Sequence, residues 1–413
     1  MISSSTAVAQ ILNFLFSTII SRLYDPSEFG ILSLFGSITA LMVVAGTLSY
    51  ENAIPISEND EESVTIFYLS LAILFAYSIT IMLISIFFGR TILSLLKADV
   101  LVKYIYLIPI SIFLTGLYNI LLQWNLRVKD FSSISRTKLS QSIFGNLVKI
   151  IFGVLRLGPI GLLVGQIASQ GAGTRTLSKS FVRSQKNVNV RLEKSKIFGS
   201  AKLYKNFPLF YVPDQLVNAA GLQLPNFFLA ALYGNEVLGM YTMANSVVSL
   251  PMILIGDSIS NVFFSEVASI GKSDPQSVRR LSLNLFKKLF LLSLIPLAIF
   301  SLFSPPLFSI IFGKKWYEAG KYAVILSFVS FSRLVFVPIS RVYTIYNKQK
   351  DQLFLDLFRL ISLCIIYAVA SNLQMGPYVY VTLNSLVIII QYVIGFLLAQ
   401  KIIRKQIELK GHE

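Results

Sequence analysis

Residues 21–30, SRLYDPSEFG, end one apolar segment, turn through an Asp-Pro-Ser sequence and open the next apolar segment. A related stretch, ALYGNEVLG, occupies residues 231–239, and its last glycine, Gly239, aligns with Gly30 at an offset of 209 residues. A shorter pair lies 224 residues apart, Phe88-Gly89-Arg90 and Phe312-Gly313-Lys314. Two pairs of similar segments at similar offsets predict a chain built from two copies of one unit of roughly 210 residues.

The composition determines the class of protein. Hydrophobic residues make up 54% of the 413 residues and charged residues only 14%, and the mean hydropathy is +0.69. A soluble domain usually carries about 25% charged residues, so this chain has too few to cover an aqueous surface of its size. The composition therefore predicts an all-α integral membrane protein, with lipid as the solvent for most of the surface.

The counts of cysteine and histidine exclude several kinds of site. Cys364 is the single cysteine and His412 the single histidine, so the chain can form no internal disulfide, no histidine-based metal site and no histidine-dependent catalytic triad. We expect no metal and no cofactor. These low counts of cysteine and histidine also disfavour the commoner enzyme chemistries.

Apolar runs of about 20 residues recur along the chain, which is the length that spans a bilayer core at 1.5 Å per residue. The first run carries Gln10 and Asn13, lacks a basic segment before it, and is interpreted as a retained helix rather than a signal peptide. We predict about twelve transmembrane helices, at 5–23, 29–54, 64–88, 104–124, 139–155, 157–177, 207–232, 237–264, 289–312, 322–346, 353–373 and 378–400.

Orientation follows from Lys and Arg in the connections. With both termini in the cytoplasm, 25 basic residues fall on the cytoplasmic side and eight on the opposite side. This bias predicts a multi-pass protein with both termini cytoplasmic. The net charge of +16 is then mainly a topology signal, and we expect no nucleic-acid partner.

An even number of helices in each half predicts two parallel halves related by an axis along the membrane normal. A basic polar stretch divides them, and we interpret it as a linker that also holds anionic lipid headgroups, with a regulatory site as the alternative. The predicted parts are an N-terminal six-helix half at 1–178, a basic cytoplasmic linker at 179–206, a C-terminal six-helix half at 207–400 and a basic cytoplasmic tail at 401–413.

Cationic side chains within the predicted spans are candidates for a binding cavity, because ionisable groups inside a membrane usually face a cavity or a partner. Lys149 and Arg333 fall near the middle of their helices, and Arg175 lies close to a cytoplasmic helix end. Arg22 ends the first helix. Guanidinium and ammonium groups suit phosphates. For Arg22 and Arg175, extension of the side chain to the interface is an equal alternative.

The acids within or beside the predicted spans are Glu51, Asp214 and Asp257. They are the groups available to couple transport to a proton or sodium ion, although Asp214 and Asp257 also suit an interhelical polar pair or anchors at the cytoplasmic ends of their helices. Asp356 and Arg359, three residues apart, are interpreted as a local helix pair.

Four stretches carry a resemblance to a known family. The chain resembles bacterial polysaccharide and O-antigen flippases, Wzx-like members of the polysaccharide transporter family in the multidrug/oligosaccharidyl-lipid/polysaccharide exporter superfamily. The stretches are SRLYDPSEFGILSLFGSI at 21–38, SYENAIPISENDEES at 49–63, WNLRVKDFSSISRTKLS at 124–140 and FGKKWYEAG at 312–320. Many members carry a longer polar lead before the first helix than this chain does, which leaves the completeness of the N-terminus open.

The resemblance implies a MATE-like fold and a transporter in the bacterial inner membrane. It implies a substrate of oligosaccharide units on undecaprenyl pyrophosphate, moved by alternating access for O-antigen, capsule or exopolysaccharide synthesis, with membrane lipids, a polysaccharide polymerase and glycosyltransferases as partners. The resemblance also implies that Arg22, which lies just before the turn LYDPSEFG at 23–30, corresponds to a position that is important in the family. One alternative is a cation-coupled multidrug exporter of the same superfamily, which predicts a cavity rich in acids. Another is a membrane polymerase or ligase, which requires a sizeable external loop.

Overall fold

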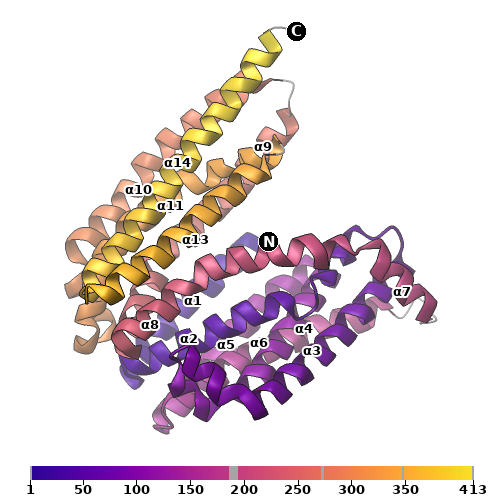
Figure 1. Ribbon diagram of the computed structural model, residues 1–413. Helices are drawn as coiled ribbons and strands as arrows, with labels where there is room; N and C mark the ends of the chain where they lie inside the picture. Colours follow the sequence, from indigo (N-terminus) through magenta and orange to yellow (C-terminus); the bar gives the residue numbers. More distant parts are fainter. Residues whose placement is uncertain (1, 186–193, 271–273, 347, 412–413) are drawn as a thin grey trace. The chain divides into compact units, whose positions relative to one another are not determined.

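The computed structural model describes residues 2–185, 194–270, 274–346 and 348–411. Within these ranges the regular structure is helical throughout, with no strand. The helices before residue 210 are α1 (Ile2–Leu23), α2 (Pro26–Ala45), α3 (Asp60–Leu95), α4 (Leu107–Arg127), α5 (Phe131–Val154), α6 (Pro159–Gln185) and the short α7 (Lys194–Leu203). The later helices are α8 (Val212–Val248), α9 (Asp257–Ile270), α10 (Pro275–Phe312), α11 (Tyr317–Phe336), α12 (Val342–Ile345), α13 (Gln349–Asn372) and α14 (Pro377–Gly411) (Figure 1).

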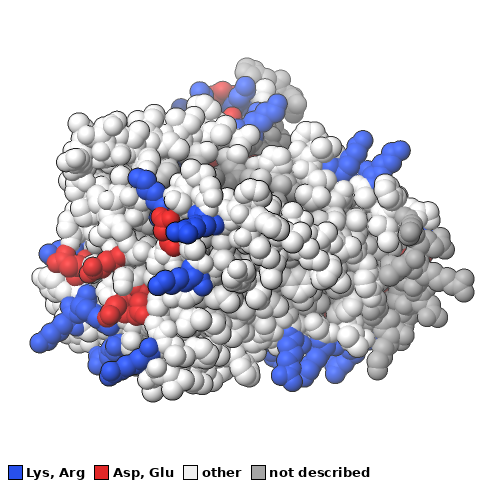
Figure 2. Space-filling view, turned by 60° about the horizontal axis from the view of Figure 1, so that its bottom comes forward, with Lys and Arg blue, Asp and Glu red and all other residues white. Residues whose placement is uncertain are grey.

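The expected membrane class is confirmed at the level of helix length and composition. Among the described residues, nine helical stretches are long and apolar enough to cross a membrane. One of them, 207–270, covers the region of two predicted helices, while α5 and α6 are not among the nine. The face drawn in Figure 2 has its charged side chains in a few patches with wide uncharged areas between them. The count of twelve helices stays a prediction.

Several predicted helix boundaries were wrong, and each has a local cause. The helix predicted over 29–54 ends at Ala45, because Leu48 and Ser49 adopt a positive φ, and a short 3-10 helix follows at Tyr50–Ile56. The helix predicted over 322–346 changes to a 3-10 turn at Val337–Arg341, which contains a proline. The helix predicted over 157–177 continues to Gln185, since no glycine or proline stops it there.

The chain divides into two compact units, residues 1–239 and 240–413. In the first, α5 packs lengthwise on α6 and against α1 (Figure 1). Aromatic rings join α3 to α4 and α6, with Phe67 stacked on Phe181 at 4.1 Å and Trp124 edge-on to both rings. The Trp124 indole N–H donates to Ser184 Oγ at 2.9 Å. This core fixes α6 beside α4 and so sets one wall of the site described below.

The two repeated stretches of the sequence meet backbone to backbone inside the first unit. A Cβ on Gly30 would overlap the carbonyl of Asn235, and a Cβ on Gly239 would overlap the carbonyl of Pro26. Gly234, with φ of 83° and ψ of 176°, breaks α8 just before this crossing. The aligned glycines are therefore the residues that permit the close approach, which explains why both stretches contain one at the same place.

In the second unit, α10, α11 and α14 pack together. Trp316, between α10 and α11, is fully buried, and the Tyr343 hydroxyl of α12 donates to the Gly395 carbonyl of α14 at 2.6 Å. The predicted local pair is confirmed, because Arg359 Nη2 lies 3.4 Å from Asp356 Oδ1. Helix α11 thus contacts both α10 and α14.

Candidate functional site

Helices α5 and α6 are the polar pair of the first unit. Their sequences place hydroxyl, amide and cationic groups at helical spacing, as in Arg175, Lys179 and Arg183, which recur every four residues along α6. Ser169 Oγ of α6 donates to the Gln141 carbonyl of α5 at 3.0 Å, which ties the helices together near their middle. Side chains four apart share one helix face, so the cations of α6 form a single row.

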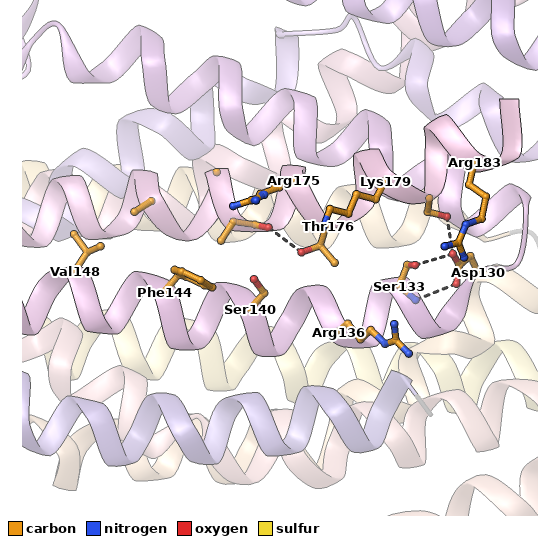
Figure 3. Close-up of a pocket in the computed structure, with 14 residues that line it drawn as sticks. Asp130, Ser133, Arg136, Ser140, Phe144, Val148, Arg175, Thr176, Lys179 and Arg183 are labelled. Atoms are coloured by element: carbon orange, nitrogen blue, oxygen red, sulfur yellow. Dashed lines mark hydrogen bonds between the residues drawn. The ribbon is translucent and has the colours of Figure 1, made fainter. Parts of the chain in front are cut away.

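A groove of about 610 Å³ runs between α5 and α6 (Figure 3). On the α5 side it extends from Ser133 to Val148, fifteen residues apart, which corresponds to about 22 Å of helix. Its lining consists of four cations (Arg136, Arg175, Lys179, Arg183), the carboxylate of Asp130, four hydroxyls (Ser133, Ser140, Thr176, Ser180) and the small or apolar residues Phe144, Val148, Ala168, Gly171 and Ala172.

The groove changes character along its length. Asp130, Arg136 and Arg183 lie at one end, whereas Phe144 and Val148 lie toward the other (Figure 3). A polar end followed by an apolar one suits an amphipathic molecule with a charged headgroup. The chemistry that the polar end offers is the binding of anions by guanidinium and ammonium groups, with hydroxyls beside them to accept or donate further hydrogen bonds.

Asp130 organises the polar end of the groove. Its carboxylate caps α5 by accepting from the Ser133 N–H at 3.0 Å and hydroxyl at 2.7 Å, and it accepts from the Ser180 hydroxyl of α6 at 2.5 Å. Partial burial works to raise the pKa of Asp130, but these hydrogen bonds from Ser180 and Ser133 and the charge of Arg136 outweigh it, so the pKa lies below its usual value. Asp130 is therefore ionised at neutral pH.

The charges of the groove do not cancel. Four cations face one carboxylate, and none of the four forms a hydrogen bond or an ion pair with another residue in the described part of the chain. Arg136, Arg175, Lys179 and Arg183 are all exposed. Four cations with one acid give a net charge of three, and in a membrane such a surplus favours an anionic ligand or water beside it.

The structure brings one of the predicted cationic residues into this groove. Arg175 lines it, whereas Lys149 follows the lining residue Val148 on α5 and lays its stem against Gly165 of α6. Lys149 is partly buried, and its carbonyl accepts from the Tyr24 hydroxyl at 2.7 Å. Arg22 lies exposed in the last turn of α1. Neither Lys149 nor Arg22 is among the lining residues.

The remaining candidates lie elsewhere. Arg333 is exposed in the last turn of α11, within electrostatic range of Tyr392 on α14. Glu51 is partly buried in the 3-10 helix after α2 and accepts a hydrogen bond from Thr47. Asp214 is exposed in the first turn of α8, and its Oδ2 accepts from Gln215 Nε2 at 3.4 Å. Asp257 begins α9, and its side chain lies outside the described residues.

Three groove cations were missed as site residues by sequence reasoning. Arg136, Lys179 and Arg183 are among the 25 basic residues that the sequence analysis assigned to cytoplasmic connections. For Lys179 and Arg183, the signal that could have found them is their helical spacing, because they extend the row begun by Arg175. That spacing carries meaning only once α6 is known to continue to Gln185.

Replacement of Asp130 tests its organising role. We expect Asp130→Ala to lower the free energy of unfolding by about 1 kcal/mol at pH 7, the usual cost of removing a helix N-cap. Because the folded-state pKa is depressed, this contribution is complete above the ordinary carboxyl pKa and is lost as the pH falls through the lowered value. Thermal unfolding of the purified chain at several pH values measures both effects. A variant with wild-type stability at pH 7 would contradict the assignment.

Comparison with known proteins assigns the chain to a family. The model of a family described as "Polysaccharide biosynthesis protein" matches residues 19–321. That range is more than half of the chain and contains the whole groove. The chain belongs to this family.

Two curated relatives agree with the family. Teichuronic acid biosynthesis protein TuaB of Bacillus subtilis is 28% identical over 137 residues, which cover 33% of this chain and 28% of TuaB. An uncharacterized membrane protein in the cps region of Klebsiella pneumoniae is 24% identical over 348 residues, covering 82% of this chain and 68% of that protein. The match to TuaB thus spans little more than a quarter of its length.

Solved structures support the fold. The chain is similar to the lipid II flippase MurJ in an inward closed conformation, with a TM-score of 0.76 at 16% identity, over 98% of this chain and 89% of that one. It is also similar to an inward-facing multidrug resistance transporter of the MATE family, with a TM-score of 0.73 at 16% identity, over 97% and 96% of the two chains. A polysaccharide biosynthesis family with a MATE- and MurJ-like fold agrees with the resemblance stated above, which is confirmed.

Proposed function

We propose that this protein is a flippase for oligosaccharide units carried on undecaprenyl pyrophosphate, which it moves across the bacterial inner membrane for the synthesis of O-antigen, capsule or exopolysaccharide. The observation that carries the proposal is the α5–α6 groove, where four cations face one carboxylate. A pyrophosphate would supply the negative charge that neutralises those cations. Membership in a polysaccharide biosynthesis family supports the same substrate class.

The graded lining of the groove fits the parts of such a substrate. The pyrophosphate would bind at Arg175 and Lys179, and the hydroxyls of Ser133 and Ser180, farther from the apolar end, would bind its first sugar. The prenyl chain would pass the apolar end at Phe144 and Val148 and remain in the lipid. The protein then acts by binding and release, without an enzymatic step.

The proposed topology has twelve membrane helices in two parallel halves, with both termini in the cytoplasm. In that orientation the end of the groove at Asp130 opens toward the cytoplasmic side. We propose alternating access as the mechanism, with the crossing of Gly30 and Gly239 forming and separating during the cycle. Glu51, Asp214 and Asp257 remain the candidate acids for coupling to an ion, and a polymerase and glycosyltransferases remain the candidate protein partners.

Complementation tests this function. The flippase gene of a host would be deleted, and surface polysaccharide measured after expression of the wild type, Arg175→Gln/Lys179→Gln, Lys149→Ala, Arg333→Ala or Asp257→Ala, with the amount of each protein checked by immunoblot. We expect the wild type to restore polysaccharide and the groove double variant to fail.

The other results discriminate between the proposals. Loss of activity in Lys149→Ala or Arg333→Ala, with an active groove variant, would move the anion site away from α5–α6. A wild type that restores no polysaccharide but confers resistance to a cationic dye would instead support the multidrug alternative. The surplus of positive charge in the groove disfavours that outcome, because like charges repel a cationic drug.

A further inference from the structure

A second basic cavity, of about 590 Å³, lies in the unit formed by residues 240–413. It is formed by the beginning of α10 and the last turns of α14, where Gln400 Nε2 donates to the buried Ser282 Oγ at 3.0 Å. Its charged lining consists of Arg279, Lys401, Arg404, Lys405 and Glu408. A polar contact of the lining residue Gln400 thus joins the two helices beside the cavity.

The cations of this cavity are not neutralised from within. Four basic groups face Glu408 alone. Neither Arg404 nor Lys405, one turn before Glu408, forms an ion pair with it, and no described residue pairs with Arg279 or Lys401. The net charge of three, inside a concave surface, calls for an anion with several acceptor oxygens, such as a phosphate.

The length of α14 places the cavity at the level of lipid headgroups. The helix contains 35 residues, which correspond to about 52 Å, whereas the apolar core of a bilayer is about 30 Å thick. Twenty residues from Pro377 reach about Leu397, so Lys401 and Arg404 lie just beyond the apolar core. A phosphate in the cavity would stand where the phosphates of a bilayer stand.

An apolar stripe leads from the membrane to this cavity. Leu386, Ile390, Val393 and Leu397 of α14 are all exposed, at 48%, 47%, 37% and 60%. Their spacing of four, three and four residues puts them on one face of the helix, and Leu397 also lines the cavity. The stripe and the cavity together match a molecule with an anionic head and apolar chains.

We propose that the α10–α14 cavity binds the headgroup of an anionic bilayer phospholipid, such as phosphatidylglycerol, with its acyl chains along the stripe of α14. Basic pockets between membrane helices on the cytoplasmic side recognise such headgroups. This site is separate from the α5–α6 groove and does not depend on the proposed function. A bound lipid would hold the ends of α10 and α14 together.

The test uses the full-length purified chain in a neutral detergent, titrated with phosphatidylglycerol, phosphatidylcholine of the same acyl chains, or glycerol 3-phosphate. Binding is measured by native mass spectrometry and by thermal unfolding. We expect phosphatidylglycerol to bind and raise the unfolding temperature, and Arg404→Gln/Lys405→Gln to bind it about 30-fold more weakly. Lys287→Gln/Lys288→Gln, which removes two exposed charges of α10 outside the cavity, should bind as the wild type does.

Three results would overturn the proposal. Equal weakening in the two double variants would indicate attraction to charge in general. Glycerol 3-phosphate that binds as well as the lipid would make this a site for free phosphate, and Leu397→Gln would then have no effect on affinity. Equal binding of phosphatidylcholine would exclude recognition of the anionic headgroup.

Discussion

Gly239→Ala is expected to abolish transport and to lower the free energy of unfolding by about 3 kcal/mol, the upper part of the usual range for an overpacked site. The new methyl group would overlap the Pro26 carbonyl, and the facing Gly30 would lose its place against Asn235. A Cβ on Gly239 would meet the Pro26 carbonyl and the Gly30 nitrogen. These are backbone atoms, which cannot move aside as a flexible side chain can. The two repeated stretches would therefore be forced apart.

Gly36→Ala in α2 is the matched control for this experiment. A Cβ at Gly36 meets no atom within 4 Å, so the change should be neutral or stabilising by up to about 1 kcal/mol through helix propensity. Complementation and thermal unfolding in detergent measure both variants. A Gly239→Ala protein with wild-type activity and stability would show that the backbone crossing is not required.

Arg175→Gln/Lys179→Gln is expected to lower the rate of substrate transfer by about 100-fold. Each lost charge-assisted hydrogen bond to the pyrophosphate is worth about 1.5 kcal/mol, and two such losses give this factor. The fold should be retained, because both side chains are exposed and pair with no described residue.

The matched control for the groove is Arg90→Gln/Lys103→Gln, which removes the same charge from exposed positions outside it. It should transfer substrate at the wild-type rate. Transfer assays at equal protein density compare the two double variants. If both lose activity alike, the effect comes from the net charge of the protein and the groove is not the anion site.

The class of fold followed from the sequence because lipid constrains composition strongly. Runs such as 64–88 and 378–400 contain no charged residue, and a single apolar run of that length satisfies its backbone hydrogen bonds in a membrane as a helix. The aligned Gly30 and Gly239 also predicted the repeat. The repeat did not predict that the two glycine-containing stretches are in contact, because equivalent positions in two copies of a unit need not be close in space. Helix ends were missed where the chain leaves lipid, as at Gln185 and Gly411, because hydropathy carries no signal there.

The candidate site could be predicted only in part, and for a physical reason. Lys149 and Arg333 were selected because they lie near the middle of their predicted helices. Position along the helix does not show which helix face a residue occupies, and the face determines what its side chain contacts. Arg175 was found because it lies inside a predicted span. Lys179 and Arg183 lie on the same face of α6, yet beyond the apolar run they resemble the basic loop residues that orient any membrane protein.

The central claim is tested most directly by transfer of a lipid-linked oligosaccharide in vesicles that contain only this protein. The substrate would be placed in the membrane with its sugar on one side, and its arrival on the other side followed with an oxidant that cannot cross the bilayer. The proposed function predicts transfer well above that of protein-free vesicles, and loss of transfer in Arg175→Gln/Lys179→Gln. Transfer no faster than in protein-free vesicles, with correctly folded protein present, would contradict it.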